Sequence, residues 1–284
     1  MPRVDVIAPD QLEGNGQITK PGVLLSWKDY KRHYLAEGDS WFSLSSLLSQ
    51  SFLYKFQNDV PLAQDTLIVN CAYPGDTLQR MVDWSTNRVF HKLLFEKRFG
   101  WKWDAVLFSA GGNDLIAALS GGILRSCASP TGFRDFLVPG ALQDFEKYFN
   151  DHFRYLVELR NYSEIVENRS APILYHTYGY PTARNAPADG VFGPWLYKAF
   201  TSTSLNIPSN YWVELSDYLM DELARMLRNQ NNLYPNLKLM DSLANVPFTR
   251  ADVGSKGNNG DWLNEIHLND SGKIKMAKFW APLL

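Results

Sequence analysis

The residues best suited to chemistry are a serine and a histidine in loops next to predicted elements. Ser40 follows a short apolar run, within Gly38-Asp39-Ser40-Trp41, at the point where a helix is expected to begin. A serine hydroxyl acts as a nucleophile when a base lies within reach. His267, in the last loop before the C-terminal helix, is the best-placed base. This pair predicts nucleophilic catalysis by serine.

Two further residues can stabilise a negatively charged oxygen. Gly75 can offer a backbone N–H after the second predicted strand, and Asn113 can offer a side-chain amide after the third. Stabilising an oxyanion requires donors aimed at one point. The carboxyl ends of parallel strands share one edge of a sheet, so these donors and Ser40 are predicted to meet there. Each of these motifs alone is also common in ordinary turns. The order in which all of them follow one another along the chain is what indicates acyl transfer.

Apolar runs alternate with helical patterns along most of the chain. The predicted strands cover 34–36, 66–71, 104–109, 172–178 and 237–240. Apolar residues recur at helical spacing over 44–56, 78–93, 141–167 and 212–226, and a short final helix is expected over 271–280. This alternation is typical of βαβ units and a parallel sheet.

These residues resemble the conserved blocks of the SGNH/GDSL hydrolases. The match consists of Gly38-Asp39-Ser40-Trp41, Gly75, Gly111-Gly112-Asn113-Asp114 and His267. The resemblance implies an α/β fold, a flavodoxin-like three-layer α/β/α sandwich with a mostly parallel five-stranded sheet. It also implies ester hydrolysis through an acyl-serine without a cofactor. Ser40 would be the nucleophile and His267 the base. The N–H groups of Ser40 and Gly75 and the Asn113 side chain would form the oxyanion hole.

One position departs from the family pattern. The family usually has Asp three residues before the catalytic histidine, and this chain has Asn264. An asparagine carbonyl can accept the imidazole Nδ1–H, but it stabilises the imidazolium less than a carboxylate does. Asp261, Glu265 or a backbone carbonyl are alternative partners for His267. Position favours Asn264, with Asp261 second, and we expect modest turnover on simple esters.

The leading interpretation is a serine esterase or lipase. An acyltransferase would use the same acyl-enzyme, and a catalytically weak relative would only bind an ester or glycan. The presence of Ser40, Asn113 and His267 argues against the weak relative. The expected partner is a small-molecule, lipid or acylated-glycan ester.

The chain of 284 residues is long enough for one large domain with insertions. Residues 1–30 are weakly periodic and are interpreted as an N-terminal extension, and residues 31–284 as the hydrolase domain. Residues 181–210 combine prolines and glycines with several aromatic side chains. We interpret this segment as a lid-like insertion or pocket wall, with an ordinary surface excursion as the alternative.

Composition and motifs exclude several other classes. Lys plus Arg number 28 and Asp plus Glu number 30, a net charge of −2 that gives no basic excess for nucleic acid. There are two cysteines and no metal-ligand motif, so no metal site is expected. Neither a signal peptide nor an apolar stretch of ~18 residues is visible. We therefore expect no transmembrane segment and a cytoplasmic location, with export by a route that needs no signal peptide as the alternative. The oligomeric state is not predicted.

Overall fold

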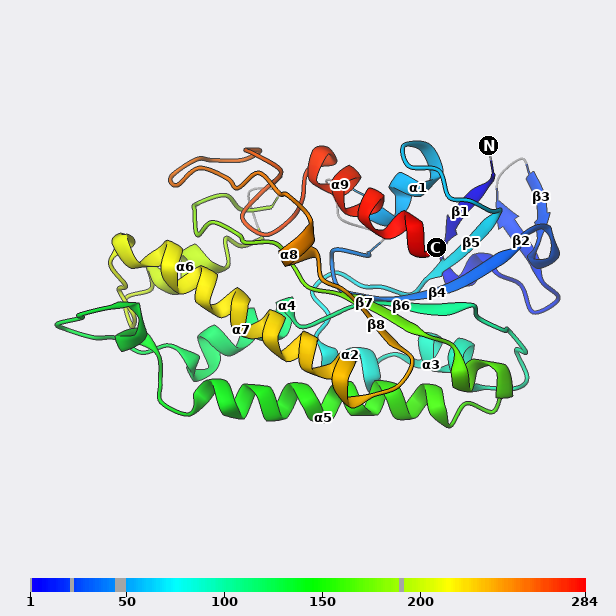
Figure 1. Ribbon diagram of the computed structural model, residues 1–284, viewed down its shortest axis with the longest axis horizontal. Helices are drawn as coiled ribbons and strands as arrows, with labels where there is room; N and C mark the ends of the chain where they lie inside the picture. The colour runs from blue at the N-terminus through cyan, green and yellow to red at the C-terminus, as the bar shows by residue number, and fades with distance from the viewer. Residues whose placement is uncertain (1, 21–22, 44–49, 189–191) are drawn as a thin grey trace.

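A parallel sheet lies between two layers of helices (Figure 1). The computed structural model describes residues 2–20, 23–43, 50–188 and 192–284. The sheet has the strand order β1-β5-β4-β6-β7-β8, and every pair is parallel. Its strands are β1 (Val4–Ile7), β4 (Arg32–Gly38), β5 (Thr66–Asn70), β6 (Ala105–Ser109), β7 (Ile173–His176) and β8 (Leu237–Met240). A separate antiparallel pair consists of β2 (Gln17–Lys20) and β3 (Val23–Ser26).

The order of the five strands from β4 onward is that of flavodoxin. Numbered along the chain from β4, the order β5-β4-β6-β7-β8 reads 2-1-3-4-5. This confirms the predicted three-layer α/β/α fold. Among the described residues the sheet has six strands instead of five, because β1 pairs with the outer edge of β5. Four residues of the predicted N-terminal extension thus belong to the main sheet.

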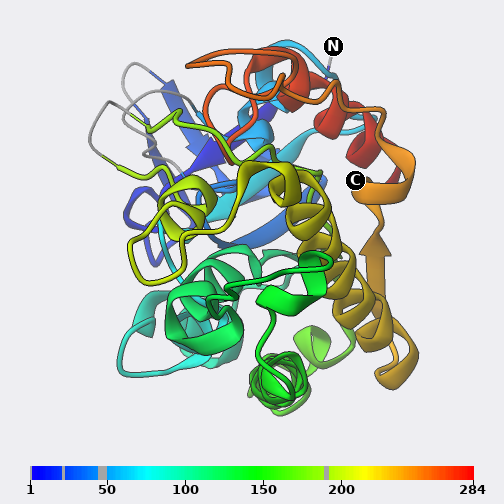
Figure 2. The ribbon, with the colours of Figure 1, turned by 90° about the vertical axis from the view of Figure 1, so that its left-hand side faces the viewer.

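The helices divide between the two faces of the sheet. On one face α1 (Lys55–Asn58) packs against α9 (Asp270–Trp280). The other face carries α2 (Leu78–Val82), α3 (Arg88–Phe95), α5 (Ala141–Asn161) and α7 (Trp212–Leu233). Figure 2 looks along α5 and shows α9 on the opposite side of the sheet. Three short helices, α4 (Gly112–Ala118), α6 (Leu196–Phe200) and α8 (Ser242–Asn245), lie in segments that follow strands β6, β7 and β8.

Apolar periodicity explains the two long helices. Both bury side chains spaced three or four residues apart, which is one face of a 3.6-residue repeat. In α5 these are Phe145, Phe149, Phe153 and Leu156, and in α7 they are Leu215, Leu219, Leu223 and Met226. Within the described ranges, no helix is both long and apolar enough to cross a bilayer.

Some helix predictions need correction or lie partly outside the described residues. The helix expected over 141–167 ends at Asn161. The pattern over 78–93 forms two helices, because the chain turns after Val82 and Asn87 then caps α3 by accepting the Phe90 N–H. Residues 44–49 of the helix predicted over 44–56 lie outside the described residues. The rest of that prediction holds a 3-10 turn over Phe52–Tyr54 and the short helix α1.

We expect Gly38→Ala to destabilise the fold. A Cβ at Gly38 would lie 2.7 Å from both the Cβ and the carbonyl oxygen of Ser109, on the adjacent strand β6. Overpacking of this kind costs about 1–3 kcal/mol of unfolding free energy. Urea denaturation would measure it, with Gly14→Ala as the control, because a Cβ at Gly14 meets nothing within 4 Å. Equal midpoints for the two variants would contradict the expectation.

Candidate active site

The site lies where the strand order reverses. β4 and β6 are neighbours in the sheet although β5 lies between them in sequence. Ligands bind at such a switch point, outside the carboxyl ends of the strands. Ser40 follows β4 and Asn113 follows β6, and both line one cavity of about 50 Å³. The fold therefore brings together two of the residues that the sequence singled out.

Ser40, His267 and Asn264 form a continuous hydrogen-bonded chain. His267 Nε2 lies 2.7 Å from Ser40 Oγ. On the other side of the ring, His267 Nδ1 lies 3.0 Å from Asn264 Oδ1. A base that contacts the nucleophile and is itself oriented by a third group is the arrangement of a catalytic triad.

The surroundings of Asn264 fix which of its atoms faces the ring. Asn264 Oδ1 also accepts the backbone N–H groups of Ile266 at 3.1 Å and of His267 at 3.0 Å. Only an oxygen can accept from these two donors, so the amide NH₂ cannot occupy this position. The Oδ1 atom therefore requires a proton on His267 Nδ1. The lone pair of Nε2 then points at the Ser40 hydroxyl.

The two other side chains considered as partners of His267 make different contacts. Asp261 accepts hydrogen bonds from Lys275 Nζ at 2.6 Å and from Ser271 Oγ at 2.7 Å. Glu265 binds backbone N–H groups of residues 184 and 195–197. Among the three side chains named from the sequence, Asn264 is thus the one that contacts the ring.

The environment of His267 keeps the imidazole neutral. Burial and the nearby Lys273 ammonium lower the pKa of His267 to about 4, from an ordinary value of 6.5. A neutral imidazole can accept a proton from serine, whereas an imidazolium cannot. Asn264 adds no negative charge that would raise this pKa. The ring is therefore in the basic form at neutral pH.

The first turn of α4, which carries Asn113, is joined to the loop that carries Gly75. Asn113 Nδ2 donates to the carbonyl of Asp76 at 3.0 Å, and Leu78 N–H donates to the Asp114 carboxylate at 2.9 Å. Gly75 adopts a φ of +84°, which favours glycine. Among the described residues, those lining the cavity include Asn113 but not Gly75. The oxyanion role of Gly75 remains a prediction.

A buried polar network supports the loop that carries Ser40. Asp39 accepts from Trp41 N–H at 3.0 Å, Ser109 Oγ at 2.8 Å and Tyr178 OH at 2.5 Å. His176 Nε2 lies 2.9 Å from the same Ser109 hydroxyl. Burial raises the pKa of Asp39 to about 6. The network joins the ends of β4, β6 and β7 directly behind the serine.

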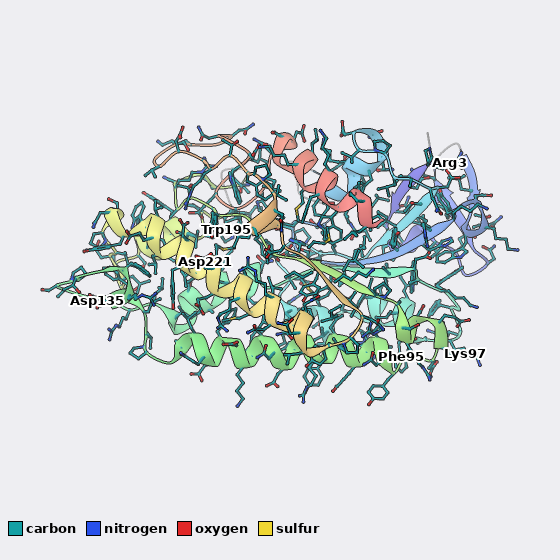
Figure 3. All side chains as sticks on the ribbon, in the orientation of Figure 1. Arg3, Phe95, Lys97, Asp135, Trp195 and Asp221 are labelled. Atoms are coloured by element: carbon teal, nitrogen blue, oxygen red, sulfur yellow. The ribbon has the colours of Figure 1, made fainter. Side chains whose placement is uncertain are left out.

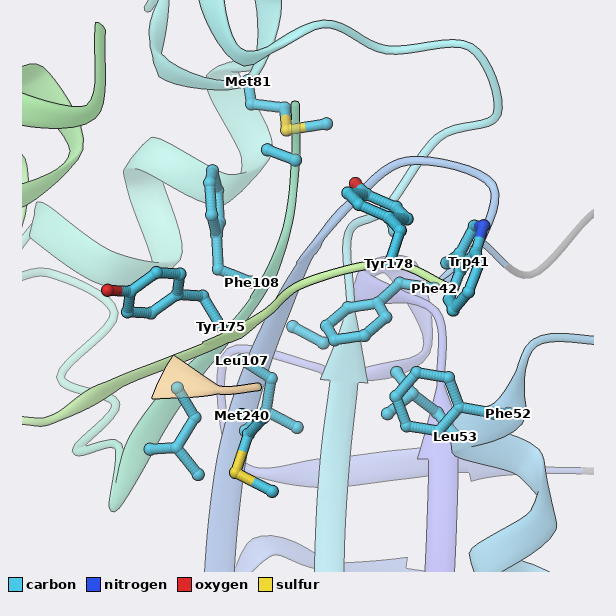
Figure 4. Close-up of a cluster of buried hydrophobic side chains, with 14 of the residues drawn as sticks. Trp41, Phe42, Phe52, Leu53, Met81, Leu107, Phe108, Tyr175, Tyr178 and Met240 are labelled. Atoms are coloured by element: carbon cyan, nitrogen blue, oxygen red, sulfur yellow. The ribbon is translucent and has the colours of Figure 1, made fainter. Parts of the chain in front are cut away.

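Aromatic side chains fill the space beside this network. Figure 4 shows Trp41, Phe42 and Tyr178 side by side. The rings of Trp41 and Tyr178 meet edge to face with centroids 5.0 Å apart, and Trp41 Nε1 donates to the Ile266 carbonyl at 3.3 Å. Trp41 therefore links the serine loop to the loop that carries His267.

A buried glutamate attaches part of segment 181–210 to the His267 loop. The Glu265 carboxylate accepts the N–H groups of Leu196 at 2.9 Å, of Tyr197 at 2.8 Å and of Trp195. The Trp195 ring packs edge to face against His267 with centroids 5.3 Å apart. Figure 3 shows Trp195 far from Arg3, the residue directly before strand β1. The described part of this segment thus contributes to the wall of the site.

Sequence reasoning missed the supporting roles of these residues, although it named Glu265 as an alternative partner of His267. Ser109, Tyr178 and Glu265 come from distant parts of the chain, and their partners are 70, 139 and up to 81 residues away. Ser109 and Glu265 each lie two residues before a motif residue, and Tyr178 lies at the end of the fourth predicted strand. These positions were their only signal. No cluster of three or more His, Cys, Asp or Glu suited to a metal ion occurs in the part of the chain that the structure describes.

Comparison with known proteins supports the fold. No family model matches the chain, and no curated protein matches it. A lipase from a goat rumen metagenome superposes with a TM-score of 0.53 at 16% identity, covering 89% of this chain and 97% of the lipase. A phospholipase A1 from Streptomyces albidoflavus gives a TM-score of 0.49 at 12% identity, covering 89% and 97%. The chain shares its α/β fold with the rumen lipase over nearly its whole length.

Proposed function

We propose that this protein is an SGNH/GDSL-type serine hydrolase that cleaves carboxylic esters. The observation that carries the proposal is the chain from Ser40 Oγ through His267 to Asn264, with distances of 2.7 and 3.0 Å. The position of Ser40 at the switch point of the sheet and the shared fold with a lipase support it. The intact chain of hydrogen bonds also favours catalysis over a relative that only binds esters.

The geometry suits a two-step reaction. Ser40 Oγ attacks the ester carbonyl carbon while His267 Nε2 takes the hydroxyl proton. The Asn113 amide and backbone N–H groups stabilise the oxyanion. His267 then gives its proton to the leaving alcohol as the C–O bond breaks, which leaves an acyl-serine. A water molecule attacks this ester, His267 takes its proton, and the acid leaves while Ser40 regains its hydrogen.

A panel of substrates tests the reaction class. The purified protein is incubated with p-nitrophenyl acetate and butyrate, p-nitrophenyl phosphate and an acetanilide, with and without a chelator. We expect hydrolysis of the two carboxylic esters alone, unchanged by the chelator. Adding a primary alcohol and measuring the new ester separates hydrolysis from acyl transfer. Failure to cleave any carboxylic ester would overturn the proposal.

The pH dependence of ester hydrolysis should report the ionisation of His267. Because the pKa of this residue is lowered to about 4, kcat/KM should stay level as the pH falls from 7 and drop only as it passes through about 4. Initial rates from pH 3.5 to 8 measure this. Burial raises the pKa of the neighbouring Glu265 to about 7. An acid limb near 7 would contradict the expectation, because it would mean that either Glu265 or a His267 with its ordinary pKa of 6.5 controls the reaction.

A further inference from the structure

A second histidine, His176, lies in the buried network behind Ser40 and has no role in the proposed reaction. Its side chain is buried. Its Nδ1 lies 2.7 Å from the carbonyl oxygen of Thr177, and its Nε2 lies 2.9 Å from Ser109 Oγ. A carbonyl oxygen can only accept a hydrogen bond, so Nδ1 carries a hydrogen. The state of Nε2 then depends on the Ser109 hydroxyl.

The Ser109 hydroxyl has one hydrogen and two neighbours that would both accept it. Its Oγ lies 2.8 Å from Asp39 Oδ1 and 2.9 Å from His176 Nε2. Together with the bond from the imidazole to the Thr177 carbonyl, these contacts are three hydrogen bonds, and each requires a hydrogen. A carboxylate, a hydroxyl and a neutral imidazole supply only two. Three satisfied contacts therefore need one additional proton.

We propose that Asp39, Ser109 and His176 share one additional proton at neutral pH. In one arrangement the proton is on Asp39, which then donates to Ser109, the reverse of the direction for a carboxylate, and Ser109 donates to Nε2. In the other arrangement the proton is on Nε2, and Asp39 is ionised. Either arrangement satisfies all three contacts, and the loss of the proton leaves two buried acceptors facing each other.

The surroundings favour the arrangement in which neither end is charged. Burial raises the pKa of Asp39 to about 6, and the nearby carboxyl group of Asp114 on α4 adds to this rise. A hydrogen bond from Ser109 lowers the same pKa, and this lowering is lost when the hydroxyl turns to His176. Burial lowers the pKa of His176 to about 4. The proton is therefore expected on Asp39.

The other groups that face these three residues do not compete for the proton. Tyr178 OH donates to Asp39 Oδ2, and burial raises the pKa of this phenol well above its ordinary value of 10. The rings that surround the His176 imidazole carry no charge at neutral pH. Within the described ranges they lie at centroid distances of 5.0 to 6.3 Å and belong to Trp41, Phe42, Phe52, Tyr178 and Trp280 (Figure 4).

Asp39 connects the shared proton to the nucleophile. It directly precedes Ser40, and its carboxyl group accepts the N–H of Trp41, the residue directly after Ser40, at 3.0 Å. The described lining of the cavity beside Ser40 includes neither Ser109 nor His176. These two residues therefore act on Ser40 through Asp39 and are positioning residues. A displacement of about 1 Å at a reacting group can lower the rate by about 100-fold.

Two spectra at pH 7 locate the proton. Infrared difference spectra between the wild type and Asp39→Asn detect the C=O band of a protonated carboxyl group. ¹⁵N NMR of histidine-labelled protein reports both ring nitrogens of His176, which are assigned by their shift in Ser109→Ala. Should Asp39→Asn fail to fold by circular dichroism, Asp39→Glu moves the carboxyl band and assigns it.

The expected result is a protonated Asp39 and a neutral His176 with its hydrogen on Nδ1. An imidazolium at His176 beside an ionised Asp39 would also support the shared proton, at the other end of the three residues. An ionised Asp39 beside a neutral His176 would overturn it. This test does not depend on the proposed function, whereas the positioning of Ser40 for ester hydrolysis rests on it.

The kinetics of Ser109→Ala test the positioning role. Ser163→Ala is the matched control, because Ser163 is also fully buried and its hydroxyl donates to backbone carbonyls that include that of Phe95. Figure 3 shows Phe95 far from Trp195, which packs on His267. On p-nitrophenyl acetate, kcat of Ser109→Ala should fall by about tenfold or more while KM stays within about twofold. Ser163→Ala should keep both values.

The outcomes separate the shared proton from the proposed function. Equal kcat values for Ser109→Ala and Ser163→Ala would overturn the positioning role, even with the shared proton observed. A raised KM at unchanged kcat would overturn it as well, because the two residues would then affect binding alone. Absence of ester hydrolysis in the wild type would overturn the proposed function and the positioning role, and the two spectra would still decide the proton count.

Discussion

Replacing Ser40 by alanine should lower kcat for ester hydrolysis by about 10⁴-fold or more. The variant lacks the oxygen that lies 2.7 Å from His267 Nε2, so no acyl-enzyme can form. The residual rate would come from the donors that polarise the carbonyl. His267→Gln should cause a loss of about 10³-fold, because the serine then has no base. Initial rates on p-nitrophenyl acetate measure both effects.

Ser43→Ala is the matched control for this loss. Ser43 lies three residues from Ser40 and is fully buried. Its hydroxyl has no hydrogen-bond partner among the atoms that the structure describes. Its removal should leave kcat within about twofold of the wild type, since no polar contact within the described ranges is lost. A Ser40→Ala variant as active as Ser43→Ala would contradict the assignment of the nucleophile.

The second large effect concerns Asn264. Asn264→Ala should lower kcat by about 100-fold or more, because Nδ1–H of His267 loses its acceptor and the ring is no longer held in the productive tautomer. The backbone N–H groups of Ile266 and His267 lose the same acceptor. Asp261→Asn is the comparison, since Asp261 binds Lys275 and Ser271 and not the ring. Equal losses in the two variants would contradict the role of Asn264.

Asn264→Asp distinguishes the charge of this group from its geometry. A carboxylate can accept the same three hydrogen bonds, and its negative charge favours the imidazolium. It should raise the pKa of His267 by about 1–3 units. The acid limb of kcat/KM should therefore move upward from about 4 by at least about one pH unit, while kcat at pH 8 is at least that of the wild type. An acid limb that stays at about 4 would show that the charge at position 264 does not change the pKa of His267.

The sequence allowed prediction of the features that depend on local patterns. Apolar runs located the strands from β4 to β8, and the segments that follow β4 and β6 held Ser40 and Asn113. The spacing of three residues between Asn264 and His267 placed the amide where the structure has it, 3.0 Å from Nδ1. Local patterns suffice here because a short loop limits which side chains can meet.

Features that depend on distant pairings could not be predicted in this way. β1 has only four residues, and it is recognisable as a strand only through its pairing with β5. The contacts of Asp39 with Ser109 and Tyr178 depend on the register of β4, β6 and β7. The buried position of Glu265 depends on where segment 195–197 returns to the sheet. A single sequence contains no periodic signal for such contacts.

Labelling with an alkyl fluorophosphonate tests the central claim most directly. This reagent forms a covalent phosphonyl ester only with a serine activated by a base, and peptide mass mapping identifies the residue. We predict one label per molecule on Ser40, none in Ser40→Ala and much slower labelling in His267→Gln. A label on another serine, or equal labelling rates for the wild type and His267→Gln, would contradict the account.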